Sequence, residues 1–385
     1  MKNFIFYSTL LSIFTESIYF NAGFDIKFFY FIVLINFFIL IFFDKIFYSK
    51  GLLIFHSIIF STGILSCILG YNKFGYCFVQ LFFILLISTY YFSFFSFFKD
   101  RFTDIIFCYC KFSFILAVVG FIKWPYDIFL GKAFHSIMLE PAHYCTIVLP
   151  AFFITLKDHS YPRYWYIVLL LSILASGSSL GIIALGLSMI LYAKRISFKK
   201  IIISSFIVVL MGFIVYTIMP NFKMRFDDTL ASSTSGDLSS ANLSSYALLS
   251  NFFVSIESFK SNPLFGNGIG SHVLSRKLYL GNLEGIEVFE KMGSENLNAQ
   301  DAGSLFSRLI SEMGLVGILG FFYFIFKFYV PVKNELYVNT IISRGILLYF
   351  FAKLFREGHY FSPEMYFFIF AYYYSSLEMN KILRN

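Results

Sequence analysis

Long apolar runs separated by short polar stretches make up most of this 385-residue chain. A helix needs about 20 mostly apolar residues to cross a bilayer, and fewer where it is broken or half-buried in protein. Eleven runs approach this length, at residues 4–20, 28–43, 51–70, 74–98, 104–122, 134–156, 164–192, 201–219, 304–326, 338–355 and 361–376. The pattern predicts an all-α polytopic membrane protein.

The run at 164–192 is long enough for two short helices, and the small residues SGSS interrupt it at 176–179. Such residues favour a turn. Because Lys and Arg are enriched in cytoplasmic loops, their distribution can decide between one segment and two. With the run split and the N-terminus inside, fifteen Lys and Arg fall in cytoplasmic loops and five in short outer loops. We therefore predict about 12 transmembrane segments with both termini cytoplasmic.

One long polar stretch, residues 220–303, is placed outside the membrane by this topology. Its six basic and nine acidic residues argue against nucleic acid or another polyanion as a partner. Within it, residues 246–260 repeat apolar side chains every three to four positions, which predicts an amphipathic helix lying on the membrane surface. The predicted organisation is nine segments in 1–219, a large outer loop at 220–303, and three segments with a short cytoplasmic tail in 304–385.

Composition agrees with a membrane protein. The chain is 58% hydrophobic and only 14% charged, whereas soluble domains average about 25% charged residues. The five cysteines lie in or beside apolar runs, and their spacing predicts neither a disulfide nor a metal site. The N-terminal apolar run lacks a small-residue cleavage site, so we expect an uncleaved first segment.

Polar side chains interrupt the predicted segments mainly at their outer ends. The candidates on this side are Glu140, His143, Arg225, Asp301, Arg308, Glu312, Arg356 and His359. Charges at membrane depth are costly and normally face a protein interior or a water-filled cavity. Since the topology was fixed without these residues, their common side predicts a shared cavity.

Plain structural pairing is the alternative for some of these charges. Glu140 with His143, and Arg308 with Glu312, have the helical spacing of pairs that neutralise each other. Three other charges have structural interpretations. We expect Glu16 to be isolated, Lys353 to snorkel towards the interface, and Glu357 to be at most a partner of Arg356.

The order of these features resembles the O-antigen polymerase (Wzy) and ligase superfamily. The resemblance rests on the segment count, the late outer loop, the helix leading into NPLFGNGIG, and ISEMGLVGILG after it. LEPAHYC and KLFREGHYFSPE look most like the polymerases of surface-polysaccharide clusters. Ligases usually carry a histidine just before the segment with the glycine turn. No histidine occurs between His272 and His359, which favours a polymerase.

The resemblance implies a metal-independent, GT-C-like glycosyltransferase of the bacterial inner membrane, with the large loop in the periplasm and no cofactor. The donor would be a glycan on undecaprenyl pyrophosphate, and the acceptor a lipid-linked repeat unit whose hydroxyl attacks the anomeric carbon. Besides these two substrates and the bilayer, a chain-length regulator is left open as a partner.

This chemistry needs a base, cations for the departing pyrophosphate and a lateral opening for lipid. We assign the pyrophosphate to Arg356 with Arg308 or Arg225, because arginine forks match phosphate oxygens. Glu140 or Asp301 is the expected base, and His143 and His359 shape or titrate the site. The remaining substrate contacts expected are Glu312 and the glycines of GNGIG, namely Gly266, Gly268 and Gly270, although a tight turn also explains those glycines.

Two rival functions stay open. An O-antigen ligase shares the architecture. A polysaccharide flippase or other transporter is the rival from another class. Transporters tend to show paired repeats and charges along both halves of a pathway. One large loop and charges on one side count against a transporter.

Overall fold

The computed structural model describes residues 1–21, 25–192, 220–330 and 338–384, with isolated residues between 202 and 217. The described chain is mainly helical, with one short antiparallel hairpin, β1 (Tyr19–Asn21) and β2 (Asp25–Lys27). The helices are α1 (Lys2–Ser12), α2 (Phe28–Phe42), α3 (Lys50–Ile68), α4 (Phe74–Phe97), α5 (Phe102–Phe129), α6 (Pro141–Lys157), α7 (Arg163–Ala175), α8 (Ser179–Tyr192), α10 (Pro220–Ser235), α11 (Leu243–Ser261), α12 (His272–Tyr279), α13 (Ile286–Lys291), α14 (Leu305–Lys327), α15 (Val338–Phe355) and α16 (Met365–Arg384).

Among the described residues, five helices are long and apolar enough to cross a membrane. They are α3, α4, α5 with the 3₁₀ turn before it, α14 and α15, while α2, α7 and α8 are shorter apolar helices. The all-α class is confirmed, and so is the break at SGSS, because α7 ends at Ala175 and α8 begins at Ser179. The count of twelve stays a prediction, and the run at 201–219 lies largely outside the described residues.

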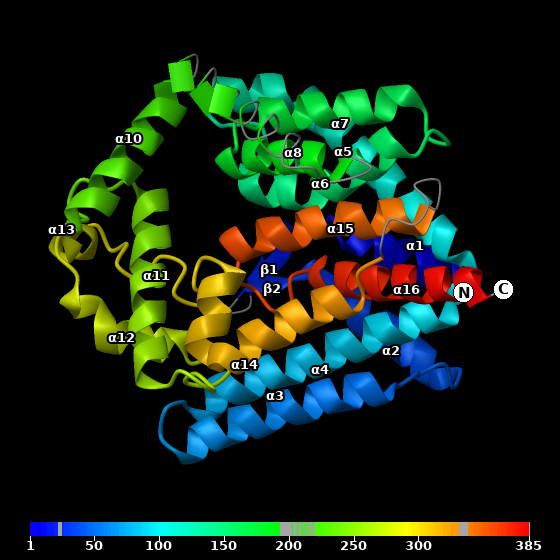
Figure 1. Cartoon of the computed structure of the whole chain (residues 1–385), viewed down its shortest axis with the longest axis horizontal. Helices are drawn as coiled ribbons and strands as arrows, with labels where there is room; N and C mark the ends of the chain where they lie inside the picture. The colour runs from blue at the N-terminus through cyan, green and yellow to red at the C-terminus, as the bar shows by residue number, and fades with distance from the viewer. Residues whose placement is uncertain are drawn as a thin grey trace.

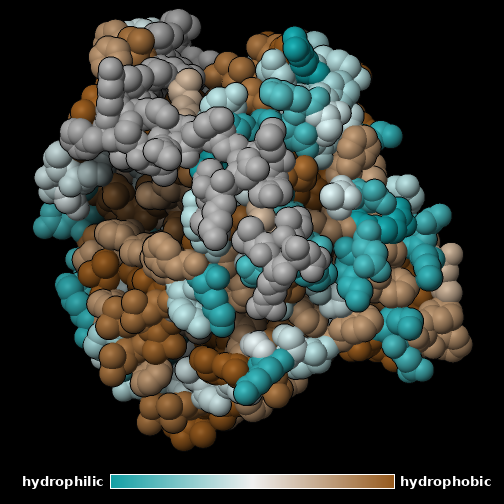
Figure 2. Space-filling model, turned by 45° about the vertical axis from the view of Figure 1, so that its right-hand side comes forward, coloured by the Kyte–Doolittle hydropathy of each residue, from teal (hydrophilic) through white to brown (hydrophobic). Residues whose placement is uncertain are grey.

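Large apolar side chains cover much of the outer surface. Phe42 and Phe129 are 81% and 84% exposed, and broad hydrophobic areas are visible on one face of the molecule (Figure 2). Soluble monomers rarely expose contiguous apolar patches of more than a few hundred Å². A surface of this kind suits contact with lipid tails.

The helices α10 to α13 stand at one end of the bundle, and both termini lie at the opposite end (Figure 1). The predicted amphipathic helix is present as α11. Its protein-facing side is mixed, with Tyr246, Asn251 and Val254 buried, whereas Leu248 and Phe252 are exposed. Part of the sequence-predicted apolar face therefore points away from the protein, while Leu249 and Phe253 pack against it.

A break in α14 joins this end to the bundle. Gly314 has φ 58° and ψ −146°, which interrupts the helix and frees backbone groups on either side. The loop after α11 satisfies them: the Asn267 amide donates to the Ser311 carbonyl (2.9 Å), and the Leu315 amide donates to the Pro263 carbonyl (2.8 Å). Irregular backbone inside a membrane protein is tolerated where protein groups satisfy it in this way.

Candidate functional site

A cavity of about 310 Å³ lies where the start of α6, the segment before α14 and the α15–α16 connection meet. Its walls are formed by Glu140, His143, Asn296, Asn298, Ala299, Gln300, Asp301, Arg356, Glu357 and His359. Five of these ten are residues that the sequence marked as candidates for one shared cavity. They come from segments that are up to about 220 positions apart in the chain, so tertiary packing alone brings them together.

Two turns in close backbone contact form one wall. The Glu357 amide donates to the Gly303 carbonyl (3.0 Å), and a Cβ added to Gly358 would lie 2.8 Å from the carbonyl oxygen of Ser304. Only glycine allows this approach. The contact sets Asp301 beside the segment that carries Arg356 and His359.

Arg356 and Glu140 form an ion pair at the cavity. The Arg356 guanidinium donates to Glu140 Oε2 at 2.8 Å, with the two side chains 20% and 44% exposed. Burial alone would raise the pKa of the Glu140 carboxyl, but the neighbouring Arg356 outweighs burial and the pKa lies below its usual value. Glu140 is therefore an anion at neutral pH, and its direct partner is Arg356, not the His143 that its helical spacing suggested.

Asp301 is the second carboxylate of the cavity. Its Oδ1 accepts a hydrogen bond from the Gly303 amide (3.1 Å), and its Oδ2 lies 3.7 Å from Nε2 of His359. It has no arginine partner among the described ion pairs. Unlike the Glu140 carboxylate, the Asp301 carboxylate is therefore not held by an arginine among the described residues.

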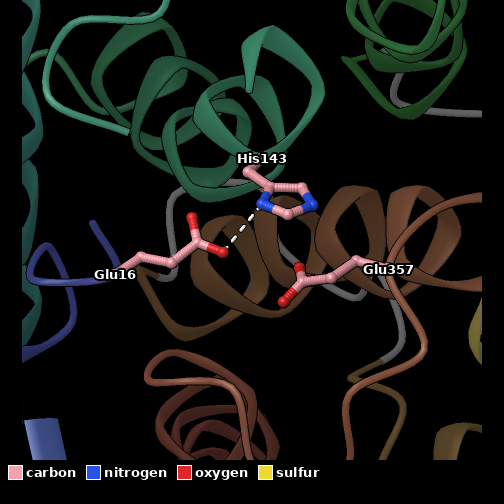
Figure 3. A group of neighbouring side chains, drawn as sticks. All are labelled: Glu16, His143 and Glu357. Carbon is pink, nitrogen blue, oxygen red and sulfur yellow. Dashed lines mark ion pairs between the residues drawn. The ribbon is translucent and has the colours of Figure 1, made fainter. Parts of the chain in front are cut away.

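A buried group of two carboxylates and an imidazole lies beside this cavity. His143 Nδ1 is 2.7 Å from Glu16 Oε1, and Glu357 completes the group (Figure 3). The expectation that Glu16 is isolated is wrong, because the chain beyond α1 folds back against the first turn of α6. This contact has no local sequence signal, since 127 positions separate Glu16 from His143.

Lys353 fixes the segment that carries Arg356 and His359. It is completely buried and donates to Ser362 (2.7 Å) and Glu364 (3.1 Å), and it lies 2.8 Å from Glu357 Oε2. The expectation that Lys353 snorkels is wrong, because two carboxylates compensate its charge inside the protein and a hydroxyl accepts a further hydrogen bond. Glu357 is likewise the partner of Lys353 and not of Arg356.

Arg308 and Glu312 lie behind the cavity and do not line it. Arg308 is buried, and its guanidinium donates to the Gly358 carbonyl and to Gln80 Oε1, both at 3.0 Å. It also stacks on the Tyr360 ring and lies 3.3 Å from Glu312. The helical pairing of Arg308 with Glu312 is therefore present, and Arg308 supports the cavity loop from beneath.

The predicted glycine contacts lie away from the cavity. Gly266, Gly268 and Gly270 all have positive φ, and close packing explains them. A Cβ on Gly270, for example, would lie 2.8 Å from the Tyr76 carbonyl oxygen. The backbone here approaches α3, α4 and α14. Arg225 belongs to α10, but its side chain is outside the part of the chain that the structure describes.

A second buried polar cluster links α11, α12 and α14 beyond the cavity. His272 lies 3.0 Å from both Asn251 Oδ1 and Ser311 Oγ, and the fully buried Arg276 donates to Asn251 Oδ1 (2.9 Å) and the Glu295 carbonyl (3.1 Å). Burial and the nearby arginine charges lower the pKa of His272 to about 3. The i, i+4 spacing of His272 and Arg276, which places both on one helix face, is the sequence signal for this cluster.

Neither a protein-family model nor a curated protein sequence matches the chain. The cavity combines an anchored arginine, three carboxylates in different environments and two imidazoles at one end of an apolar helical bundle. Such a set can bind an anionic group and remove a proton from a hydroxyl.

Proposed function

We propose that this protein polymerises lipid-linked oligosaccharide repeat units into O-antigen or a related surface polysaccharide. The donor is a glycan on undecaprenyl pyrophosphate, the acceptor is a single repeat unit on the same lipid, and the reaction takes place at the periplasmic face of the bacterial inner membrane. In this proposal the chain crosses the membrane about twelve times, with both termini cytoplasmic and residues 220–303 periplasmic.

The observation that carries the proposal is the convergence at the cavity. Glu140, His143, Asp301, Arg356 and His359 were singled out because a charge-based topology placed them on one side of the membrane, and all five line one cavity. Independent structural charges would be expected to scatter over both ends of the bundle. The cavity also lies at the end of the bundle that α10 to α13 cover (Figure 1).

Arg356 is the proposed contact for the donor pyrophosphate. In the free protein its guanidinium is held by Glu140 at 2.8 Å, so it is oriented before substrate arrives. A pyrophosphate oxygen can replace the carboxylate as the partner of the arginine fork. The positive charge then stabilises the leaving group as the bond between the anomeric carbon and the phosphate oxygen breaks.

Asp301 is the proposed general base. It receives the proton of the acceptor hydroxyl while that oxygen forms the new bond to the anomeric carbon. We prefer Asp301 to Glu140 because the ion pair with Arg356 lowers the pKa of Glu140 and makes it a weaker base. His359, 3.7 Å from Asp301, orients the carboxylate, and Arg308 positions the loop through the Gly358 carbonyl.

The lipid parts of both substrates require an apolar approach to this end of the bundle. Leu248 and Phe252 are exposed on α11. Large apolar side chains such as Phe129 are also exposed on the helices of the bundle. In this proposal that face of α11 rests on the outer leaflet and guides the polyprenyl chains.

The test is complementation of a polymerase deletion in the parent strain, followed by electrophoresis of its lipopolysaccharide. We expect Arg356→Ala and Asp301→Asn to abolish the ladder and leave a single-unit band, while Arg101→Ala, a change at an exposed ion pair with Asp104, keeps the ladder. Wild-type ladders from both cavity variants, at wild-type membrane levels, would exclude these roles. Complete loss of attached O-antigen, with no single-unit band, would indicate a ligase or a transporter.

A further inference from the structure

The wall of the cavity holds a group of side chains that the proposed transfer reaction does not use. Glu16 follows α1, His143 lies in the first turn of α6, and Glu357 belongs to the α15–α16 connection (Figure 3). One possible ligand atom from each lies within 4.8 Å of the other two. Around a tetrahedral ion with bonds of about 2.1 Å, neighbouring ligands are about 3.4 Å apart, so the side chains would have to approach one another by up to about 1.4 Å to close the group on a cation.

Glu16 supplies the second observation. Its side chain is 2% exposed, and within the described residues neither carboxylate oxygen takes part in a hydrogen bond. The 2.7 Å contact with His143 Nδ1 lacks hydrogen-bond geometry, and the Lys27 ammonium is 3.9 Å away. Both contacts are to Oε1, and Oε2 has no partner among the described residues. A buried carboxylate oxygen left in this way is costly, so the group is expected to have a further positive partner.

The net charge around the cavity also favours a bound cation. The lining residues, their ion-pair partners, and the further ion-pair partners of Glu16 and Lys353 comprise five carboxylates and three cations, which leaves a charge of −2 when the histidines are neutral. The carboxylates are Glu16, Glu140, Asp301, Glu357 and Glu364, and the cations are Lys27, Lys353 and Arg356. A divalent cation brings this total to zero. If the proposed function is right, it also removes the repulsion that an incoming diphosphate would meet.

We propose that Glu16, His143 and Glu357 bind a first-row divalent cation such as Mn²⁺ or Zn²⁺. Two carboxylates and one imidazole form a donor set that these ions accept. His143 and Glu357 line the cavity, so coordination positions that the protein leaves open face it. The site differs from the metal-independent mechanism that the family resemblance implies, and the binding claim does not depend on the reaction.

The experiment uses the full-length protein, purified in detergent, stripped with EDTA and titrated with Mn²⁺ alone. Bound and free Mn²⁺ are distinguished by their electron paramagnetic resonance signals. The melting temperature is measured in parallel, because a ligand that binds the folded state raises the melting temperature. We expect one saturable Mn²⁺ per chain, displaced by Zn²⁺. Glu16→Gln is expected to weaken binding at least tenfold. Asp127→Asn, which changes a buried carboxylate paired with Lys123 outside the group, is expected to leave binding unchanged.

Two results would overturn the site. One is the absence of a saturable Mn²⁺ signal in the wild-type protein, a measurement that needs no variant to fold. The other is equal Mn²⁺ affinity in wild type and Glu16→Gln, with both melting at the same temperature in EDTA. The ladder assay separates this inference from the proposed function. Mn²⁺ binding without polymerisation would support the metal site and exclude the proposed function. Polymerisation without Mn²⁺ binding would support the proposed function and exclude the metal site.

Discussion

Replacing Lys353 by methionine tests how the cavity loop is held. The side chain is completely buried and is the cation shared by Glu357 and Glu364, which are themselves 4% and 2% exposed. Methionine keeps the length and removes the charge. Glu364 retains donors in Ser362 (2.6 Å) and Tyr349 (3.1 Å), whereas the only described side-chain partner of the Glu357 carboxylate in an ion pair or hydrogen bond is Lys353.

The cost follows from that asymmetry. Removing one partner of a buried ion pair typically destabilises a protein by about 3–5 kcal/mol, because the other charge is left uncompensated. An unfolding entropy of about 2.1 cal/mol/K per residue converts 4 kcal/mol into a melting-temperature decrease of about 5 °C for a chain of 385 residues. The double variant Lys353→Met with Glu357→Gln removes the stranded charge and should recover most of the loss.

The assay is thermal unfolding of the detergent-purified protein in EDTA, which excludes any contribution from a metal. Wild type, Lys353→Met and the double variant are compared at one pH. A Lys353→Met protein that melts within about 1 °C of wild type would refute the reasoning, since the conversion above predicts a larger change. A double variant less stable than Lys353→Met would show that the uncompensated charge of Glu357 is not the cause.

Two further predictions concern the junction with α10 to α13. Because the pKa of His272 is about 3 in the folded state and about 6.5 unfolded, the unfolded state binds the proton first as pH falls. Stability should decrease below pH 6.5, by about 2 kcal/mol at pH 5. His272→Asn should flatten this decrease in melting curves, and an unchanged pH profile would contradict it. At the break in α14, Gly314→Ala should destabilise the protein by at least about 1–3 kcal/mol, because φ is positive and the new Cβ would lie 2.6 Å from the Pro263 carbonyl oxygen. Gly320→Ala, in the same helix with open space around it, is the control, and equal melting temperatures for the two variants would oppose the packing argument.

Features set by local pattern were predictable from the sequence. The break at SGSS, the helix over residues 246–260 and the mainly helical class follow from hydrophobic periodicity and turn chemistry, and all three are present. The meeting of five of the eight candidate residues at one cavity was also predicted, because positive-inside charge counting assigns residues to a side of the membrane without knowing their contacts. Charge counting does not predict which side chains contact each other.

The predictions of side-chain partners failed because spacing within one helix suggests only local pairs. Glu140 and His143 lie three apart, yet Glu140 pairs with Arg356 and His143 contacts Glu16. The buried Lys353 looked like a snorkelling lysine although Glu357 follows it at the i, i+4 spacing of a helical pair. Its other acidic partner, Glu364, comes from the following turn, whose path the sequence does not specify. Arg308 was placed at the substrate because its bond to a distant backbone carbonyl has no sequence signature.

The central claim is that the cavity joins lipid-linked repeat units, and reconstitution tests it most directly. Purified protein in liposomes would be supplied with undecaprenyl-pyrophosphate-linked repeat units from the parent strain, and the products separated by length. We expect glycans of two or more units with release of undecaprenyl pyrophosphate, and neither product with Arg356→Ala. Undiminished polymer from Arg356→Ala, or no elongation by a folded wild-type protein with authentic substrate, would contradict it.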